Sequence, residues 1–155
     1  MILRPYRASD AGGTLDVFLR AIRTTASRDY TPEQVGAWAS DEIDVVAWGD
    51  RRLAARTQVA ELDGVVVGFT DVDDEGYVDM LFVDPAVGRR GVATALLAWV
   101  VDTAQAAGAS ELTTHASLTA RPFFERVGFE VVAERRPVLR GVAMTNFAMR
   151  RTLTH

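Results

Sequence analysis

The residues best suited to chemistry in this sequence are main-chain groups at the start of a helix. The glycine- and arginine-rich run 88–91 follows Pro85 and precedes a stripe of apolar residues at helical spacing that begins at Val92. The first turn of a helix leaves N–H groups unpaired, and no Ser, Thr, Asp or Asn between Pro85 and Gly91 can cap them. The pattern favours a diphosphate held by amides. A plain glycine-rich turn with two solvated arginines is the alternative.

Two segments of the chain together resemble the GNAT superfamily of N-acetyltransferases. Gly88-Arg89-Arg90-Gly91-Val92-Ala93 is similar to the acetyl-CoA signature Gln/Arg-x-x-Gly-x-Gly/Ala, with glycine in the first position. Residues 117–129 are similar to the later segment Asn-x-x-Ala-x-x-Phe-Tyr-Glu-x-x-Gly-Phe, with Ser117 and Phe124 in place of Asn and Tyr. The matches flank one helix in the expected order. The sequence of residues 79–93 and 122–126 also resembles one bacterial branch of this superfamily whose acceptor substrates are poorly defined.

This resemblance implies acetyl-CoA as the cofactor. The amides of residues 89–94 would hold the pyrophosphate, and main-chain groups of Leu81 and Val83 would pair with the pantetheine arm. The amide of Leu81 or Phe82 would face the thioester oxygen. Ser117 would hold a water or contact the cofactor, with a simple turn residue as the alternative. The expected cofactor-binding residues are Leu81, Phe82, Val83, Gly88, Arg89, Arg90, Gly91, Val92, Ala93, Thr94, Ser117 and Phe124.

Acetyl transfer to an amine needs a base for the ammonium group and an acid for the leaving thiolate. Phe124 cannot donate a proton, so the family's usual acid is absent or moved. Asp79 is the candidate base, because it shares a strand face with Tyr77, Leu81 and Val83 and an apolar setting would raise its pKa. A pairing with arginine or exposure to solvent is its alternative. Tyr30 is the candidate acid, or a packed tyrosine with a hydrogen-bonded hydroxyl.

The acceptor pocket of GNAT folds lies between the N-terminal helices and the last strands. The substrate-binding residues expected there are Arg23, Thr24, Tyr30, Trp38 and Asn146, with Thr25 and Met144 as further candidates. His115 is a single histidine on a strand and is expected to be structural. The acidic turn 71–76 lacks the glutamate of a calcium loop, because Phe82 stands at that position. No metal is expected.

The elements that position these residues follow from hydrophobic periodicity and turn signals. Helices are expected after Ser9-Asp10, fading around 24–27, after a Thr31 cap, as an irregular piece through 45–53, over the stripe from Val92 to Gly108, and over 121–127. Strands are expected at 2–7, 57–62, 65–70, 77–83, 111–116, 129–136 and 143–151. This order indicates an α+β fold with a mixed sheet. The resemblance adds that the fourth and fifth strands splay apart around the cofactor and are joined by a long crossover helix.

Composition bounds the remaining possibilities. The chain has 155 residues, which predicts one domain over 1–155, and its net charge of −4 argues against nucleic acid as a partner. There is no cysteine, so neither a thiolate metal site nor a cysteine nucleophile is available. No run is long enough to span a membrane and the N-terminus lacks a signal-peptide core, so a cytoplasmic protein is expected. GNAT proteins often dimerise, so a homodimer is compatible with the resemblance.

The leading hypothesis is an acetyl-CoA-dependent N-acetyltransferase that acts on a primary amine of a small molecule or peptide. Direct transfer is expected, because no cysteine can carry the acetyl group. The alternative is a regulatory module that binds acyl-CoA with weak catalysis, as Phe124 and Gly88 suggest. A Rossmann enzyme is disfavoured, because its glycine loop would follow the first strand of a βαβ series.

Overall fold

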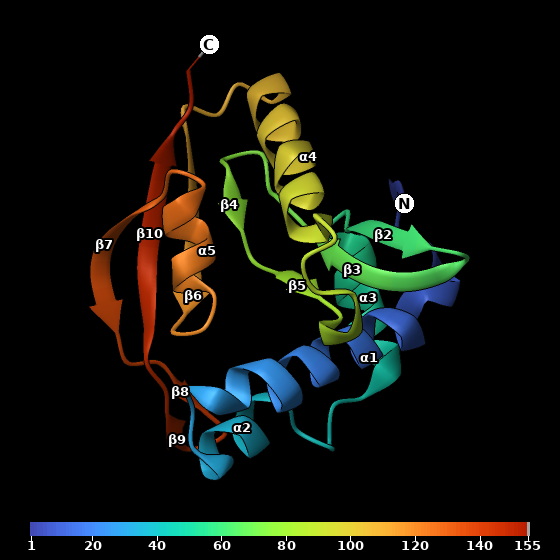
Figure 1. The fold of residues 1–155 in the computed structure, drawn as a ribbon, viewed down its shortest axis with the longest axis vertical. Helices are drawn as coiled ribbons and strands as arrows, with labels where there is room; N and C mark the ends of the chain where they lie inside the picture. The colour runs from blue at the N-terminus through green and yellow to red at the C-terminus, as the bar shows by residue number, and fades with distance from the viewer. Residues whose placement is uncertain (155) are drawn as a thin grey trace.

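The computed structural model describes residues 1–154, which form the mixed α+β arrangement of Figure 1. Short 3₁₀ or π-helical segments occur at Ala8–Asp10, Ala21–Thr25, Ala26–Arg28 and Pro85–Val87. The regular elements, in chain order, are β1 (Ile2–Pro5), α1 (Ala11–Arg20), α2 (Pro32–Trp38), α3 (Val45–Ala54), β2 (Gln58–Leu62), β3 (Val65–Thr70), β4 (Tyr77–Val78), β5 (Leu81–Val83), α4 (Val92–Ala106), β6 (Glu111–Ser117), α5 (Arg121–Arg126), β7 (Glu130–Arg135), β8 (Val138–Leu139), β9 (Val142–Ala143) and β10 (Asn146–Thr152).

The strands form two four-stranded sheets that diverge from each other. One sheet has the order β1-β2-β3-β5 and the other β4-β6-β10-β7, while β8 and β9 form a separate hairpin. The expected strand 77–83 is broken at Asp79–Met80. Its first part pairs parallel with β6, through Tyr77 and Thr113, and its second part pairs antiparallel with β3, through Phe82 and Phe69. The chain therefore splays between β5 and β6, as the resemblance implies.

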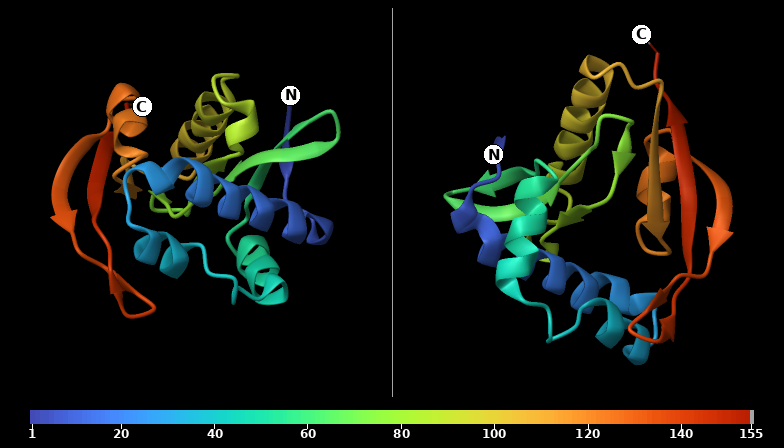
Figure 2. Two further views of the ribbon diagram at one scale, coloured as in Figure 1. Left: turned by 60° about the horizontal axis from the view of Figure 1, so that its bottom comes forward. Right: turned by 180° about the vertical axis from the view of Figure 1, so that it is seen from behind.

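Helices cover both faces of the first sheet, as Figure 2 shows. Adjacent residues of a strand point to opposite faces, and Val59 and Ala60 of β2 do so here. Val59 joins a buried cluster with Phe18 of α1, whereas Ala60 packs with Leu96 of α4. Helix α4 is the crossover from β5 to β6, and its far end packs on the second sheet with α5. The sheets and the crossover helix thus hold the splayed strands rigidly.

Local sequence signals account for most element boundaries. Thr31 caps α2 by accepting a hydrogen bond from the Gln34 amide. Asp63 and Gly64 both have positive φ, as a tight hairpin between β2 and β3 requires. Gly108, with φ of 84°, follows the end of α4 in the left-handed conformation that terminates helices.

The structure departs from the sequence-based expectations in three places. The first helix does not end near residue 24, but continues through a π-helical turn and a 3₁₀ turn to Arg28. The piece at 45–53, expected to be irregular, is a regular helix because Asp44 caps it through the amides of Val46 and Ala47. The β8–β9 hairpin was not expected. Among residues 1–154, no helix has the length and apolar character needed to cross a membrane.

Candidate active site

The outer edge of β5 is open where the sheets diverge. β5 pairs with β3 on one side only. The carbonyl of Met80 accepts from the Asp71 amide, and the amide of Asp84 donates to the Val67 carbonyl, so Met80 and Asp84 direct their main-chain groups toward β3. Because main-chain groups alternate along a strand, those of Leu81 and Val83 face the open edge. An extended ligand can therefore pair with these two residues.

The turn after β5 presents further unpaired amides. Arg89 and Gly91 both adopt left-handed backbone conformations, with φ of 65° and 74°, a geometry that turns successive N–H groups toward one side. Gly91 is the N-cap of α4, and no side chain caps that end. The first-turn N–H groups of the 15-residue helix α4 consequently remain available to an anion, and the helix dipole favours negative charge there.

The open edge and the helix start share one cleft of about 490 Å³. Every expected cofactor residue lines it except Arg90, which is exposed outside it. Its opposite wall comes largely from the first helix and from the segment around α5, of which Ser117 and Phe124 were expected to bind the cofactor. Further residues that line the cleft were not expected to do so. These additional lining residues are Ala21, Ile22, Thr25, Ala26, Trp38, Val87, Thr119, Ala120, Phe123 and Arg126.

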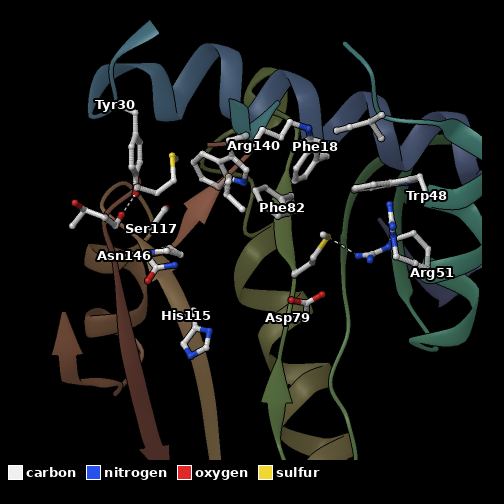
Figure 3. A pocket seen from close by; sticks show the side chains of 18 of the residues that line it. Phe18, Tyr30, Trp48, Arg51, Asp79, Phe82, His115, Ser117, Arg140 and Asn146 are labelled. Atoms are coloured by element: carbon white, nitrogen blue, oxygen red, sulfur yellow. Dashed lines mark hydrogen bonds between the residues drawn. The ribbon is translucent and has the colours of Figure 1, made fainter. Parts of the chain in front are cut away.

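A second cavity of about 480 Å³ adjoins the cleft. It lies between the first helices, the strand break and the ends of β6 and β10, and Figure 3 looks into it. Its walls are largely aromatic, with Phe18, Tyr30 and Trp48 among them. Trp38, Phe82 and Ser117 line both this cavity and the cleft. A group that enters through the cleft therefore meets the second cavity at these three side chains.

Asp79 lies at the second cavity, together with Tyr77 and His115. The Asp79 side chain is exposed and has no hydrogen bond or ion pair within residues 1–154. Tyr77 Oη lies 3.2 Å from His115 Nδ1. Burial, aided by the charge of Arg135, lowers the pKa of His115 although Asp79 opposes this shift, so the imidazole is neutral at pH 7 and able to accept a proton.

The strand break separates residues that the sequence placed on one face. Tyr77 and Asp79 line the second cavity, whereas Leu81 and Val83 line the cleft. The expected apolar setting is also not found at Asp79, which is exposed.

The buried carboxylate of this region is Asp71, which sequence reasoning did not single out. It is 3% exposed, and burial raises its pKa to about 6. One carboxylate oxygen accepts from the amides of Asp79 and Met80, at 2.9 and 3.4 Å. The other lies 3.8 Å from Nη1 of Arg52, which is equally buried. Asp71 thereby stabilises the strand break through hydrogen bonds to its main-chain amides.

Tyr30 is buried, and its hydroxyl has two partners. It donates to the Thr145 carbonyl at 2.6 Å and accepts from the Leu118 amide at 2.9 Å. Figure 3 labels the Tyr30 ring. Burial also raises its pKa. This is the packed, hydrogen-bonded tyrosine of the alternative interpretation. A proton donor would have to give up the bond to Thr145.

The expected substrate residues divide into two groups. Trp38 and Asn146 line the second cavity, as does Met144. Arg23 and Thr24 line neither cavity, and Arg23 instead binds the Ala39 carbonyl and Asp41. The reason is helical geometry: Ala21, Ile22, Thr25 and Ala26 form the face turned to the cleft, so the two residues between them point away.

The sequence and the fold are similar to those of known proteins. The family model described as an acetyltransferase (GNAT) domain matches residues 26–151. The chain belongs to the GNAT acetyltransferase family. It is 43% identical over 148 residues to the uncharacterized N-acetyltransferase YafP of Escherichia coli strain K12, covering 96% of this chain and 93% of YafP.

Two solved structures extend the comparison. A GCN5-related N-acetyltransferase from Rhodopseudomonas palustris has a TM-score of 0.94 and 34% identity, over 98% of this chain and 95% of that one. The PaiA N-acetyltransferase of Thermoplasma acidophilum, solved in complex with coenzyme A, has a TM-score of 0.76 and 15% identity, over 97% and 98%. The latter likeness concerns the fold.

The GNAT tyrosine position is occupied by Phe124. This ring is 4% exposed and packs against Phe123 and Phe129 at centroid distances of 5.4 and 5.0 Å. It forms part of the cleft wall and of the hydrophobic core that packs on the second sheet. Ser117, in the asparagine position, accepts from the Ala120 amide at 3.0 Å. Its hydroxyl proton has no acceptor within residues 1–154, so it can donate into the junction of the two cavities.

Proposed function

We propose that this chain is an acetyl-CoA-dependent N-acetyltransferase that transfers the acetyl group directly to a primary amine. The observation that carries this proposal is the junction of the cleft with the second cavity at Trp38, Phe82 and Ser117. A thioester delivered along β5 reaches an amine held in the cavity only at this point. The coenzyme A complex of the T. acidophilum protein, which shares the fold, supports the choice of cofactor.

The chain's own groups can hold acetyl-CoA by its polar parts. The pyrophosphate would lie against the amides of residues 89–94, with Arg89 adding charge. The pantetheine arm would pair with Leu81 and Val83 along the open edge, which places the thioester near Phe82. The cofactor supplies the activated acetyl group. Because the contacts are main-chain contacts, the geometry of the loop matters more than the identity of its side chains.

In the transfer the amine nitrogen forms a bond to the acetyl carbon and the carbon–sulfur bond breaks. The ammonium proton must leave before attack, and the thiolate must gain a proton afterwards. We assign the first step to Asp79, whose exposed carboxylate has no competing partner in residues 1–154. Tyr77 and neutral His115 lie in the same cavity and can relay the proton to solvent.

The contacts of Tyr30 argue for a positioning role in place of proton donation. Its hydroxyl joins the segment after β6, at Leu118, to the segment before β10, at Thr145. These segments adjoin Ser117 and Asn146, which line the second cavity, called the acceptor cavity from here on. Tyr30 therefore fixes the mouth of that cavity. The leaving thiolate can take its proton from Ser117 or from water.

A second candidate is an acyl-CoA-binding module with weak catalysis. It is favoured by one observation: among residues 1–154, no tyrosine lines the cofactor cleft. Titration with acetyl-CoA by calorimetry tests both candidates, because each requires saturable binding that stabilises the fold. A screen of amines with detection of free thiol then separates them. Turnover with any amine supports the enzyme, whereas binding without turnover across the screen supports the module. No binding at millimolar cofactor contradicts both.

A further inference from the structure

The acceptor cavity contains more cationic than anionic groups. Three arginines line it, namely Arg51, Arg52 and Arg140, against the single carboxylate of Asp79. His115 does not alter this balance, because burial lowers its pKa and leaves it neutral at pH 7. A cavity built only to attract a cationic amine would carry the opposite charge. The excess positive charge of the arginines therefore favours an anionic group on the ligand.

The three arginines differ in how far the protein neutralises them. Arg52 is buried, lies 4.7 Å above the Trp48 ring and faces Asp71 at 3.8 Å, so its charge is compensated. The guanidinium of Arg51 has no hydrogen bond or ion pair within residues 1–154. Arg140 donates at 2.7 Å to the carbonyl of Ala37, a neutral group, and has no acidic partner in the described chain. Arg51 and Arg140 thus carry the uncompensated charge.

The body of the cavity is suited to a flat, apolar ligand. Phe18, Tyr30, Trp38, Trp48 and Phe82 form its walls. Several of these rings already contact one another edge to face, with Tyr30 and Trp38 at a centroid distance of 5.4 Å. Aromatic rings pair favourably in such tilted arrangements. Aromatic rings therefore line a large part of the cavity that also holds the arginines.

We propose that the acceptor is a primary alkylamine attached to an aromatic ring that also carries an anionic group such as a carboxylate. This inference rests on the proposed function and names its substrate class. The amine lies at the junction beside Phe82 and Ser117, the ring lies among the aromatic walls, and the anion binds the guanidinium of Arg51 or Arg140.

A matched pair of acceptors tests the charge preference. Para-aminomethylbenzoate and para-aminomethylbenzamide share the ring and the amine and differ in the distant anionic group. With acetyl-CoA, kcat/KM for the carboxylate should exceed that for the carboxamide by about tenfold or more, since a charge-assisted hydrogen bond is lost with the amide. Equal kcat/KM values for the two compounds would overturn the proposal.

Arginine variants locate the anion site. Arg51→Gln, Arg140→Gln and the double variant should raise KM for the carboxylate toward that for the carboxamide, with kcat and the carboxamide KM little changed. Both arginines are exposed, so the fold should be retained. Arg28→Gln is the control, because Arg28 is exposed and lines neither cavity. A preference that survives in the double variant contradicts the assignment.

A binding measurement separates failure of this inference from failure of the proposed function. Calorimetric titration of the protein with each compound, with and without coenzyme A, needs no turnover. Tighter binding of the carboxylate, lost in the double variant, supports the anion site even if no acetyl transfer occurs. Equal affinity of the two compounds overturns it even if the enzyme acetylates other amines.

Discussion

The carboxylate of Asp71 accepts a hydrogen bond of 2.9 Å from the main-chain amide of Asp79. The bond withdraws this amide from the β ladder at the point where the strand divides into β4 and β5. The same carboxylate also accepts from Met80. Since Asp79 faces the acceptor cavity and Leu81 faces the cofactor cleft, one buried side chain determines how the two halves of the site are oriented. Asp71 is therefore a positioning residue.

The ionisation of Asp71 should make stability depend on pH. Burial raises its pKa from 3.8 to about 6, so the native state holds this proton more tightly than the unfolded chain does. The favourable contribution is complete below about pH 4 and is lost as the pH rises through about 6. Relative to the wild type, Asp71→Asn should therefore gain roughly 3 kcal/mol of unfolding free energy between these limits. Urea unfolding at several pH values measures it; a constant difference contradicts the raised pKa.

Substitution of Gly91 should abolish binding of acetyl-CoA. Gly91→Glu places a carboxylate at the amides that would hold the diphosphate, and no atom lies within 4 Å of the added Cβ. The left-handed φ of 74° costs about 1 kcal/mol for a residue with a side chain, so the fold should persist. Gly108→Glu is a matched control at the other end of α4, with φ of 84° and equally open space. Loss of affinity in both variants, or in neither, contradicts the loop assignment.

The cleft beside β5 and the start of α4 could be predicted from sequence because it depends on main-chain geometry that local motifs encode. The glycines at 88 and 91, the apolar run before them and the helical stripe after them define where the strand ends and the helix begins. Helix caps such as Thr31 and turns such as Asp63–Gly64 were equally local signals. Family membership and the splayed α+β fold followed from these segments and are confirmed.

The acceptor side could not be predicted in the same way, because it is assembled from contacts between distant residues. Asp71 lies in an acidic turn and gives no sign in the sequence that Arg52 will be buried beside it. The partners of Tyr30, at 118 and 145, are likewise far along the chain. Arg23 and Thr24 line neither cavity, because helical spacing places them between residues that face the cleft. Both catalytic assignments, Asp79 and Tyr30, stay predictions.

Removal of the Tyr30 hydroxyl should affect stability more than proton transfer. Tyr30→Phe leaves the Thr145 carbonyl and the Leu118 amide without their partner, which costs about 1–3 kcal/mol. The melting temperature should fall by about 2–4 °C for each kcal/mol lost. Tyr77→Phe is the control, because its single bond to His115 is long and exposed. If Tyr30→Phe instead keeps the stability of the wild type and changes the alkaline limb of the pH–rate profile, Tyr30 is the proton donor after all.

Neutralisation of Asp79 should impair chemistry and leave cofactor affinity intact. Asp79→Asn should lower kcat by roughly 10²–10⁴, the usual contribution of a general base, whereas the Kd for acetyl-CoA should not change because Asp79 lines only the acceptor cavity. Asp74→Asn is the control, since this exposed carboxylate pairs with Arg56 outside both cavities. Should Asp79→Asn retain full kcat while His115→Gln loses it, with wild-type activity falling only at a pH below the ordinary value for histidine because burial lowers the pKa of His115, the base is His115.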